Sequence, residues 1–253
     1  MTKNGGVDDK GRALDAVFGG IARRYDLANH VLSCGVDFYW RRAAAAMAAP
    51  GAGDRVLDMC CGTGDFAFAF ARARADTGRI TGCDFSPEMI ELAGIKESKF
   101  KRRRKYAAVA MDWRVCDCAA TEFETESFDI VSCAFGVRNM ADLSAGLEEM
   151  YRLLRPGGRV CILDFSLPKN AVIRAAYLPY FRWILPVLGG LISGDYSAYR
   201  YLAESVRRWD RQVDIAALLH KAGFREVVAR PLTSGIATVH VGHKPPAPER
   251  KRS

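Results

Sequence analysis

The spacing of hydrophobic and polar positions divides the chain into two regions. Between Leu14 and about Met47, apolar residues recur at helical spacing, with a polar break at 26–29 and a Pro-Gly loop after the last turn. We therefore expect an N-terminal helical block over residues 13–50. Residues 1–12 and 245–253 are polar or basic and show no such period, so we expect both tails to be disordered.

After this block, short apolar runs alternate with helical patterns. The runs predict strands at 55–59, 79–84, 110–116, 128–134 and 159–165. A helix at 213–222 and strands at 225–230 and 236–243 follow, and the last two strands could form a hairpin. Strands that alternate with helices favour a doubly wound sheet. We predict one α/β domain over residues 13–244 with a mostly parallel, seven-stranded sheet.

The segment at 170–209 interrupts this alternation, because it is aromatic, contains prolines and reads as helical. Its longest apolar stretch, 177–193, is broken by Pro179, Arg182 and Pro186. It therefore falls short of the roughly 20 uninterrupted apolar residues that a membrane span needs. The N-terminus also lacks an apolar signal region. We expect a soluble, cytoplasmic protein, with peripheral contact at the inner face of an anionic membrane as an open alternative.

The charge of the chain leaves its partner open. A net charge of +8 and a pI of about 9.1 are compatible with nucleic acid, an anionic membrane surface or an acidic ligand. Part of the excess positive charge lies in one basic run at 96–105. Attraction to anionic lipid is one interpretation of the run, and a solvated helix end is the commoner one. Since no aromatic platform accompanies the run, we expect no nucleic-acid partner.

The cysteines and histidines predict no metal site. The eight Cys show neither the spacing of a metal finger nor a secretory context, which favours reduced thiols. Cys116 and Cys118 form a C-x-C pair without a second pair or a nearby His. The four His do not cluster with acids at ligand spacing.

Candidate chemistry begins at the end of the first predicted strand. Gly62 and Gly64 remove side chains where the chain turns sharply or approaches a ligand. The N–H groups at the start of the next helix would face a polar or anionic group. Asp84 ends the second strand about 20 residues later, where an acid can accept hydrogen bonds from both ribose hydroxyls. Capping of the following helix is the alternative role of Asp84.

The turn departs from a dinucleotide-binding turn, because bulky Phe66 follows it and no third glycine is present. This favours adenosine with a compact amino-acid tail over a pyrophosphate, and S-adenosylmethionine fits. Asp58 and Asp65 are candidate acceptors for its ammonium group. Strand-end capping and favourable charge at a helix N-terminus are their alternative roles.

The same residues resemble the class I S-adenosylmethionine methyltransferases. The matching segments are Val56-Leu57-Asp58, Cys61-Gly62-Thr63-Gly64-Asp65, and Asp84-Phe85-Ser86 with Met89. From Val17 to Lys244 the chain further resembles the ubiquinone/menaquinone biosynthesis C-methyltransferases, the UbiE family. The most specific segments are Phe135-Gly136-Val137-Arg138-Asn139 and Tyr199-Arg200-Tyr201-Leu202-Ala203-Glu204-Ser205.

The resemblance implies a Rossmann-like fold, S-adenosyl-L-methionine as cofactor and a polyprenylated quinol as methyl acceptor. The quinol would be demethylmenaquinol, 2-methoxy-6-polyprenyl-1,4-benzoquinol or both, methylated at a ring carbon. This chain has Asp117-Cys118 where the family commonly has Asn-Ala, and Ala134 where it usually has Ser. The predicted cofactor-binding residues are Asp58, Gly62, Thr63, Gly64, Asp84, Phe85, Asp117, Cys118 and Ala134.

The predicted catalytic residues are Arg138 and Asn139, which follow the fourth strand at the edge where α/β sites lie. The resemblance favours stabilisation of a phenolate by Arg138, or proton removal through a water that Asn139 positions. Electrostatic stabilisation is preferred, because Arg is a poor base. From the residues alone, an Arg that fixes a loop by a salt bridge is the alternative.

Residues 177–201, within the insertion at 170–209, are expected to cover the acceptor. The side chains expected to line a groove for the isoprenoid tail are Phe181, Trp183, Ile184, Leu185, Val187, Leu188, Leu191 and Ile192. A packing layer or a homodimer surface is the alternative. Tyr25 and Asp26 are expected to close over the cofactor. Methyl transfer to another lipid or small phenol, and nucleic-acid binding without catalysis, remain the alternative functions.

Overall fold

The computed structural model describes residues 30–74, 76, 78–194 and 196–247. The predicted first helix, the N-terminal tail, and Tyr25 and Asp26 lie outside these residues. The remainder of the predicted helical block is α3, Val36–Met47.

Seven strands form one sheet in the order β3-β2-β1-β4-β5-β7-β6. Their bounds are β1 Arg55–Met59, β2 Arg79–Asp84, β3 Met111–Val115, β4 Phe128–Ala134, β5 Leu154–Phe165, β6 Arg225–Leu232 and β7 Ala237–His243. The first five strands are parallel, and β7 runs antiparallel to both β5 and β6. The predicted doubly wound sheet and terminal hairpin are confirmed.

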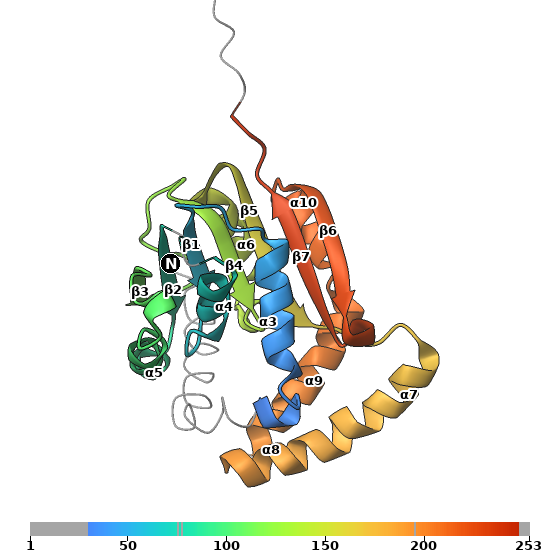
Figure 1. Cartoon of the computed structure of the whole chain (residues 1–253). Helices are drawn as coiled ribbons and strands as arrows, with labels where there is room; N and C mark the ends of the chain where they lie inside the picture. Colours follow the sequence, from blue (N-terminus) through green and yellow to red (C-terminus); the bar gives the residue numbers. More distant parts are fainter. Residues whose placement is uncertain (1–29, 75, 77, 195, 248–253) are drawn as a thin grey trace, which may run out of the picture.

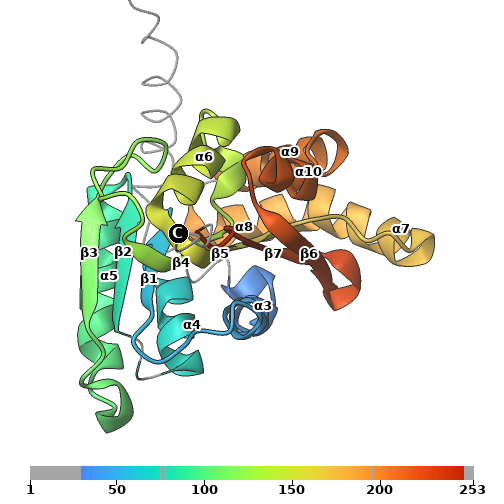
Figure 2. The same ribbon diagram turned by 90° about the horizontal axis from the view of Figure 1, so that it is seen from above.

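Helices cover both faces of this sheet (Figure 1, Figure 2). One face carries α3 and α4, Asp65–Ala73, and the other carries α6, Leu143–Leu153, and α10, Ile215–Lys221. Buried side chains of the central strands alternate between the two layers: Val56 and Ile130 pack on the α3 and α4 side, and Leu57 and Val131 on the other. The near-continuous apolar runs thus follow from burial on both faces.

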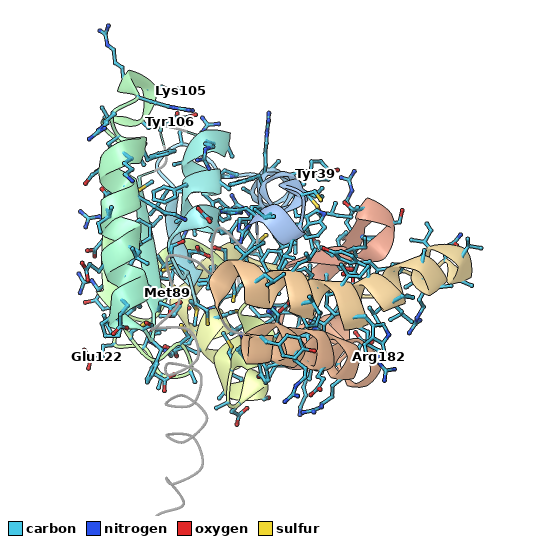
Figure 3. All side chains as sticks on the ribbon, turned by 90° about the horizontal axis from the view of Figure 1, so that it is seen from below. Tyr39, Met89, Lys105, Tyr106, Glu122 and Arg182 are labelled. Carbon is cyan, nitrogen blue, oxygen red and sulfur yellow. The ribbon has the colours of Figure 1, made fainter. Side chains whose placement is uncertain are left out.

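Helix α5, Pro87–Phe100, connects β2 to β3 and begins at a proline, a residue that fits the first turn of a helix. The basic run lies at its end. In Figure 3, Lys105 lies at the opposite end of the molecule from Arg182 of the insertion.

The insertion forms α7 Ala171–Pro179, a π-helical turn Tyr180–Ile184, α8 Leu185–Ser193 and α9 Tyr196–Gln212. The first three run on as one helical arm that extends beyond the sheet (Figure 1). Pro179 and Pro186 interrupt the apolar run but do not break the arm, because a widened turn follows the first and the second lies in the first turn of α8. Within the described residues, one helix, Ala171–Ile192, is long and apolar enough to cross a membrane.

Candidate functional site

A cavity of about 570 Å³ opens at the carboxyl ends of β1 and β4. The strand order reverses at β1, whose neighbours are β2 and β4, so this is the switch point where doubly wound folds bind ligands. Ten of the eleven predicted site residues line it, namely Asp58, Gly62, Thr63, Asp84, Phe85, Asp117, Cys118, Ala134, Arg138 and Asn139. Gly64 is absent from the lining.

The two glycines of the turn, Gly62 and Gly64, are required for different physical reasons. Gly62 has a φ of 52° and no atom within 4 Å of an added Cβ, so its role is conformational, beside the open cavity. Gly64 has a φ of 86°, and a Cβ there would lie 2.5 Å from Cη2 of Trp113. Gly64 therefore lets the start of α4 pack against β3, behind the cavity wall.

The ends of both central strands also hold non-glycine residues in the left-handed region. Cys60 after β1 has a φ of 52°, and Phe135 after β4 has a φ of 60°. A Cβ on the adjacent Gly136 would lie 2.5 Å from Cβ of Cys60, so the two strained turns pack on each other. Strain of this kind is typical of functional sites.

Asp84 bridges two loops at the cavity wall. Its carboxylate accepts hydrogen bonds from the N–H of Gly62 at 2.8 Å and the N–H of Ser86 at 3.1 Å. Burial raises the pKa of Asp84, and the two N–H donors oppose that shift. The bond to the N–H of Ser86, the residue before α5, ties Asp84 to the start of that helix, and Asp84 also lines the cavity.

A charged cluster surrounds the start of α4. Nζ of Lys96 lies 2.7 Å from Oγ1 of Thr63 and 2.9 Å from Oδ1 of Asp65, and Nε2 of His30 lies 3.4 Å from the other oxygen of Asp65. Burial alone would raise the pKa of Asp65, but His30, Lys96 and Arg41 outweigh it and hold the pKa well below its usual range. Asp65 is therefore an ionised acceptor beside the cavity.

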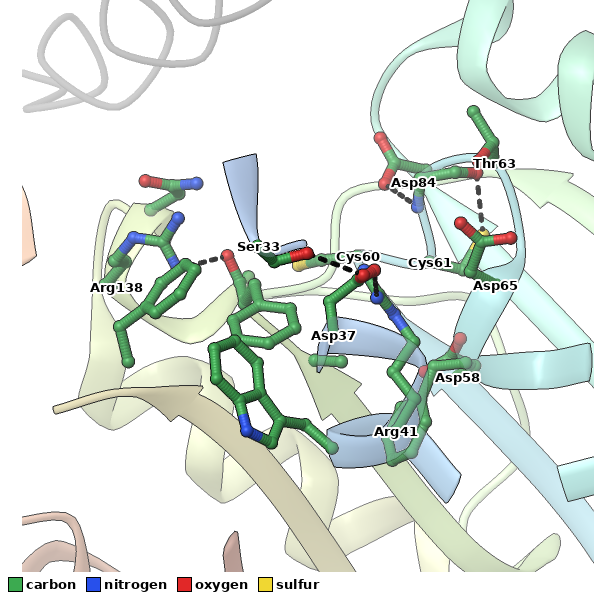
Figure 4. A pocket seen from close by; sticks show the side chains of 18 of the residues that line it. Ser33, Asp37, Arg41, Asp58, Cys60, Cys61, Thr63, Asp65, Asp84 and Arg138 are labelled. Atoms are coloured by element: carbon green, nitrogen blue, oxygen red, sulfur yellow. Dashed lines mark hydrogen bonds and ion pairs between the residues drawn. The ribbon is translucent and has the colours of Figure 1, made fainter. Parts of the chain in front are cut away.

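Residues 30–41, just before and within the start of α3, contribute a second part of this cluster. Asp37 lies between Nδ1 of His30, at 2.7 Å, the hydroxyl of Ser33, at 2.8 Å, and the guanidinium of Arg41. The hydrogen bonds to Asp37 and Asp65 raise the pKa of His30 to about 9. Figure 4 shows Ser33, Asp37 and Arg41 between Arg138 and the wall that carries Asp58, Asp65 and Asp84, called the acidic wall below.

Asp58 is fully buried at the base of the cavity. Its Oδ1 accepts from Oγ of Ser132 at 2.9 Å, and its Oδ2 has no partner of hydrogen-bond geometry among the described residues. Burial raises the pKa of Asp58 to about 7. A cationic group in the cavity would therefore favour its ionised form.

Arg138 forms a buried ion pair. Its NH1 donates to Oδ1 of Asp164 at 2.7 Å and to the carbonyl of Phe135 at 2.6 Å, and the guanidinium lies over the ring of Phe165. This is the loop-fixing geometry of the alternative role. Arg138 and Asn139 still line the cavity, and the buried Oδ1 of Asn139 has no partner among the described residues.

The wall opposite the acidic residues is aromatic. The rings of Phe135 and Phe165 lie 4.6 Å apart, Trp40 packs edge-on to Phe165, and the indole N–H of Trp40 donates to Thr233. The insertion adds Tyr177, Tyr180, Phe181 and Leu185. The cavity thus has a polar half and an apolar half.

The sequence of the chain matches the ubiE/COQ5 methyltransferase family over residues 6–244. The chain belongs to this family. A ubiquinone/menaquinone biosynthesis C-methyltransferase UbiE of Geotalea daltonii is 42% identical over 94% of this chain and 99% of its own length. A demethylmenaquinone methyltransferase of Deinococcus radiodurans is 44% identical over 95% of this chain and 96% of its own length. The predicted family and the predicted enzyme class, a methyltransferase, are confirmed.

Solved structures agree on the fold of this ubiE/COQ5 family member. A SAM-dependent methyltransferase from Aquifex aeolicus superposes with a TM-score of 0.57 at 16% identity, over 81% of this chain and 89% of that one. A Haemonchus contortus phosphoethanolamine N-methyltransferase 2 crystallised with S-adenosyl-L-methionine has a TM-score of 0.54 at 19% identity, over 81% of this chain and 52% of that one. The predicted class I methyltransferase fold is therefore confirmed.

In this family member the prediction for the insertion holds only in part. Of the eight side chains expected to line an apolar groove, Phe181 and Leu185 line the cavity. The others point elsewhere, because only one face of the arm packs on the body; Trp183 is 64% and Leu191 78% exposed. Those six residues form no part of the cavity wall.

Sequence reasoning missed the polar residues His30, Asp37, Arg41 and Lys96. The basic run at 96–105 predicts a solvated Lys96, whereas its Nζ contacts Thr63 and Asp65. Its spacing from Met89, Ala93 and Phe100 could have shown otherwise, because these four positions share one helical face and the other three are buried.

Proposed function

We propose that this family member transfers the methyl group of S-adenosyl-L-methionine to a ring carbon of a polyprenylated quinol. Demethylmenaquinol, 2-methoxy-6-polyprenyl-1,4-benzoquinol, or both would be the acceptor. The observation that carries the proposal is the single cavity with an acidic wall facing an aromatic wall. It offers one surface to a cationic nucleoside and the other to an apolar ring. The names of relatives from Geotalea and Deinococcus agree with this function.

The acidic wall supplies partners for each end of the cofactor. Asp84 would accept from the ribose hydroxyls with the lone pairs that Gly62 and Ser86 leave open. Asp58 and Asp65 would accept from the ammonium group, and Asp117 from the adenine amino group. The N–H groups at the start of α4 would face the carboxylate.

The reaction requires alignment and exclusion of water more than covalent chemistry. The bound sulfonium supplies an already activated methyl group, so the walls must hold the acceptor carbon in line with it. We assign Arg138 to stabilisation of the phenolate, although its pairing with Asp164 leaves less charge for that purpose. Asn139 would position the water that takes the phenol proton, since the residue lines the cavity and its buried Oδ1 has no partner among the described residues.

We further propose that the protein works in the cytoplasm and contacts the membrane through the arm. An isoprenoid quinol dissolves in lipid, and Val172, Trp183 and Leu191 are each more than 60% exposed on the arm. The neighbouring Arg174 and Arg182 would complement anionic headgroups. Burial of the same residues in a homodimer is the alternative.

Methyl transfer to defined acceptors tests the proposal. The purified chain is given S-adenosylmethionine with an isotopically labelled methyl group and, separately, a reduced demethylmenaquinol or the reduced benzoquinol precursor. We expect label on the ring carbon of at least one product by mass spectrometry. If the chain binds the cofactor but labels neither quinol, the acceptor belongs to another class. Quinone profiling of a deletion strain distinguishes the two branches in the cell.

A further inference from the structure

Three thiols lie close together beside the cavity of the candidate site, although their spacing in the sequence does not predict this. The sulfur atoms of Cys83, Cys116 and Cys118 all lie within 4.8 Å of one another. Two of these residues are buried, and Cys116 is partly exposed. The C-x-C pair alone predicted no metal site, and the third sulfur comes from a different strand.

The sheet register explains the meeting. Strands β2 and β3 are parallel, and the N–H of Cys116 donates to the carbonyl of Asp84 at 2.9 Å just beyond their paired ends. Positions 116 and 118 therefore stand beside position 83. The carboxylate of Asp117 accepts a hydrogen bond from the N–H of Ala119 at 2.8 Å. This bond fixes the loop that holds Cys116 and Cys118.

One sulfur–sulfur distance matches coordination of a single ion, and the third sulfur lies within 4.8 Å of the other two. Zinc–thiolate bonds of about 2.3 Å separate sulfurs by roughly 3.8–4.0 Å in tetrahedral or trigonal coordination. The sulfurs of Cys83 and Cys118 are 3.9 Å apart. The sulfur of Cys118 also accepts the N–H of Cys60 at 3.2 Å, a contact that orients it as outer contacts orient metal ligands.

We propose that Cys83, Cys116 and Cys118 form a binding site for a soft, thiophilic cation such as Zn²⁺ or Cd²⁺. Three thiolates bind the ion, and each thiol releases its proton to solvent as its bond to the ion forms. The fourth position is open to a solvent atom or a small ligand. Partly exposed Cys116 provides the entry path, and the carboxyl groups of Asp84 and Asp117 at the same strand ends favour a cation. The site does not depend on the proposed methyl transfer.

Cd²⁺ titration of the full, reduced chain tests this site. We expect a thiolate-to-metal charge-transfer band that saturates at one Cd²⁺ per chain and that Zn²⁺ displaces. Cys83→Ala and Cys116→Ala should each weaken Cd²⁺ binding at least tenfold. These two are preferred to Cys118→Ala because neither side chain lines the cofactor cavity. Cys161→Ala is the matched control, since Cys161 is a buried free thiol on β5, outside the three-thiol group.

Two outcomes would overturn the proposal. One is that the Cys116→Ala variant binds a single Cd²⁺ as tightly as the unchanged protein does. The other is an equal loss of binding in Cys161→Ala. Should Cys83→Ala fail to fold, protection of Cys116 from alkylation by one equivalent of Zn²⁺ in the unchanged chain decides the question, and unprotected alkylation rejects the site.

Discussion

Arg138 and Asp164 form an ion pair in which both side chains are only 4% exposed, with NH1 of the arginine 2.7 Å from Oδ1 of the aspartate. The pair joins the loop after β4 to the end of β5 beside the cavity. Burial raises the pKa of Asp164, and the charge of Arg138 opposes this shift. Neither residue can therefore be changed alone without leaving its partner buried and uncompensated.

Arg138→Ala should unfold more easily as well as lose activity. Breaking a buried ion pair typically costs about 3–5 kcal/mol, because one charge remains without its partner. Urea unfolding measures this cost. The double variant Arg138→Met with Asp164→Leu removes both charges and should recover most of the stability. We expect this double variant to bind cofactor and to show little methyl transfer. Normal turnover by a stable double variant would contradict the catalytic assignment of Arg138.

Asp84→Ala should abolish cofactor binding. The substitution removes the proposed acceptor for the ribose hydroxyls and also releases the N–H groups of Gly62 and Ser86. Asp84→Asn keeps one carbonyl acceptor and should bind more weakly than the unchanged chain but better than Asp84→Ala. Calorimetry with S-adenosylmethionine measures both, and Glu91→Gln on the exposed side of α5 is the control. Unchanged affinity in a folded Asp84→Ala protein would reject the ribose role.

The sequence predicted the strands well because their apolar runs are buried on both faces, and it predicted the glycine turn because few residues fit there. It could not show which side chains meet across the sheet. Arg138 pairs with Asp164 only because β4 lies beside β5 with Ala134 opposite Leu163. Cys83 reaches Cys118 for a similar reason. Strand order and register are tertiary properties, so residues far apart in sequence were beyond the reach of local patterns.

Gly64→Ala should destabilise the fold. The new Cβ would lie 2.5 Å from Trp113, and the positive φ of 86° is unfavourable for alanine, so we expect a loss of about 1–3 kcal/mol. Gly94→Ala is the matched control, because it lies within helix α5 with open space around it and should gain up to about 1 kcal/mol. Chemical unfolding of both variants checks the contrast. Equal stability of the two would show that Trp113 moves aside without cost.

Stability should fall as the pH rises through the titration of His30. The folded pKa of His30 is about 9, above its unfolded value of about 6.5. The stabilisation is therefore fully present below about pH 6.5 and is lost as the pH rises through about 9. Allowing for solvent screening, we expect a loss of about 1–2 kcal/mol between pH 7 and pH 10.

The comparison for His30 is the variant His30→Gln, which cannot titrate. Its unfolding free energy should vary less over this pH range than that of the unchanged chain. His220→Gln, at an exposed position on α10, should retain the full dependence. If the unfolding free energies of the unchanged chain and of His30→Gln fall in parallel as the pH rises, the pH dependence belongs to other groups.

If the arm contacts the membrane, variants of the arm should weaken vesicle binding and variants of the basic run should not. Leu191→Ala and Trp183→Ala each remove a large exposed apolar side chain from the arm, so partitioning onto vesicles of phosphatidylcholine and phosphatidylglycerol should fall roughly tenfold. Val228→Ala, a 56% exposed position on β6, is the control. Stability should change little, because all three side chains are exposed.

Replacing Arg102, Arg103 and Arg104 with Gln tests the other surface. Lys105 of the run and Arg182 of the arm lie at opposite ends of the molecule in Figure 3, so the two surfaces can be changed separately. If the arm is the contact, the triple variant should keep most of its vesicle affinity at 0.15 M salt. The reverse result, with the arm variants binding normally and the triple variant released, would assign membrane contact to the basic run and leave the arm to a homodimer, which native mass spectrometry would reveal.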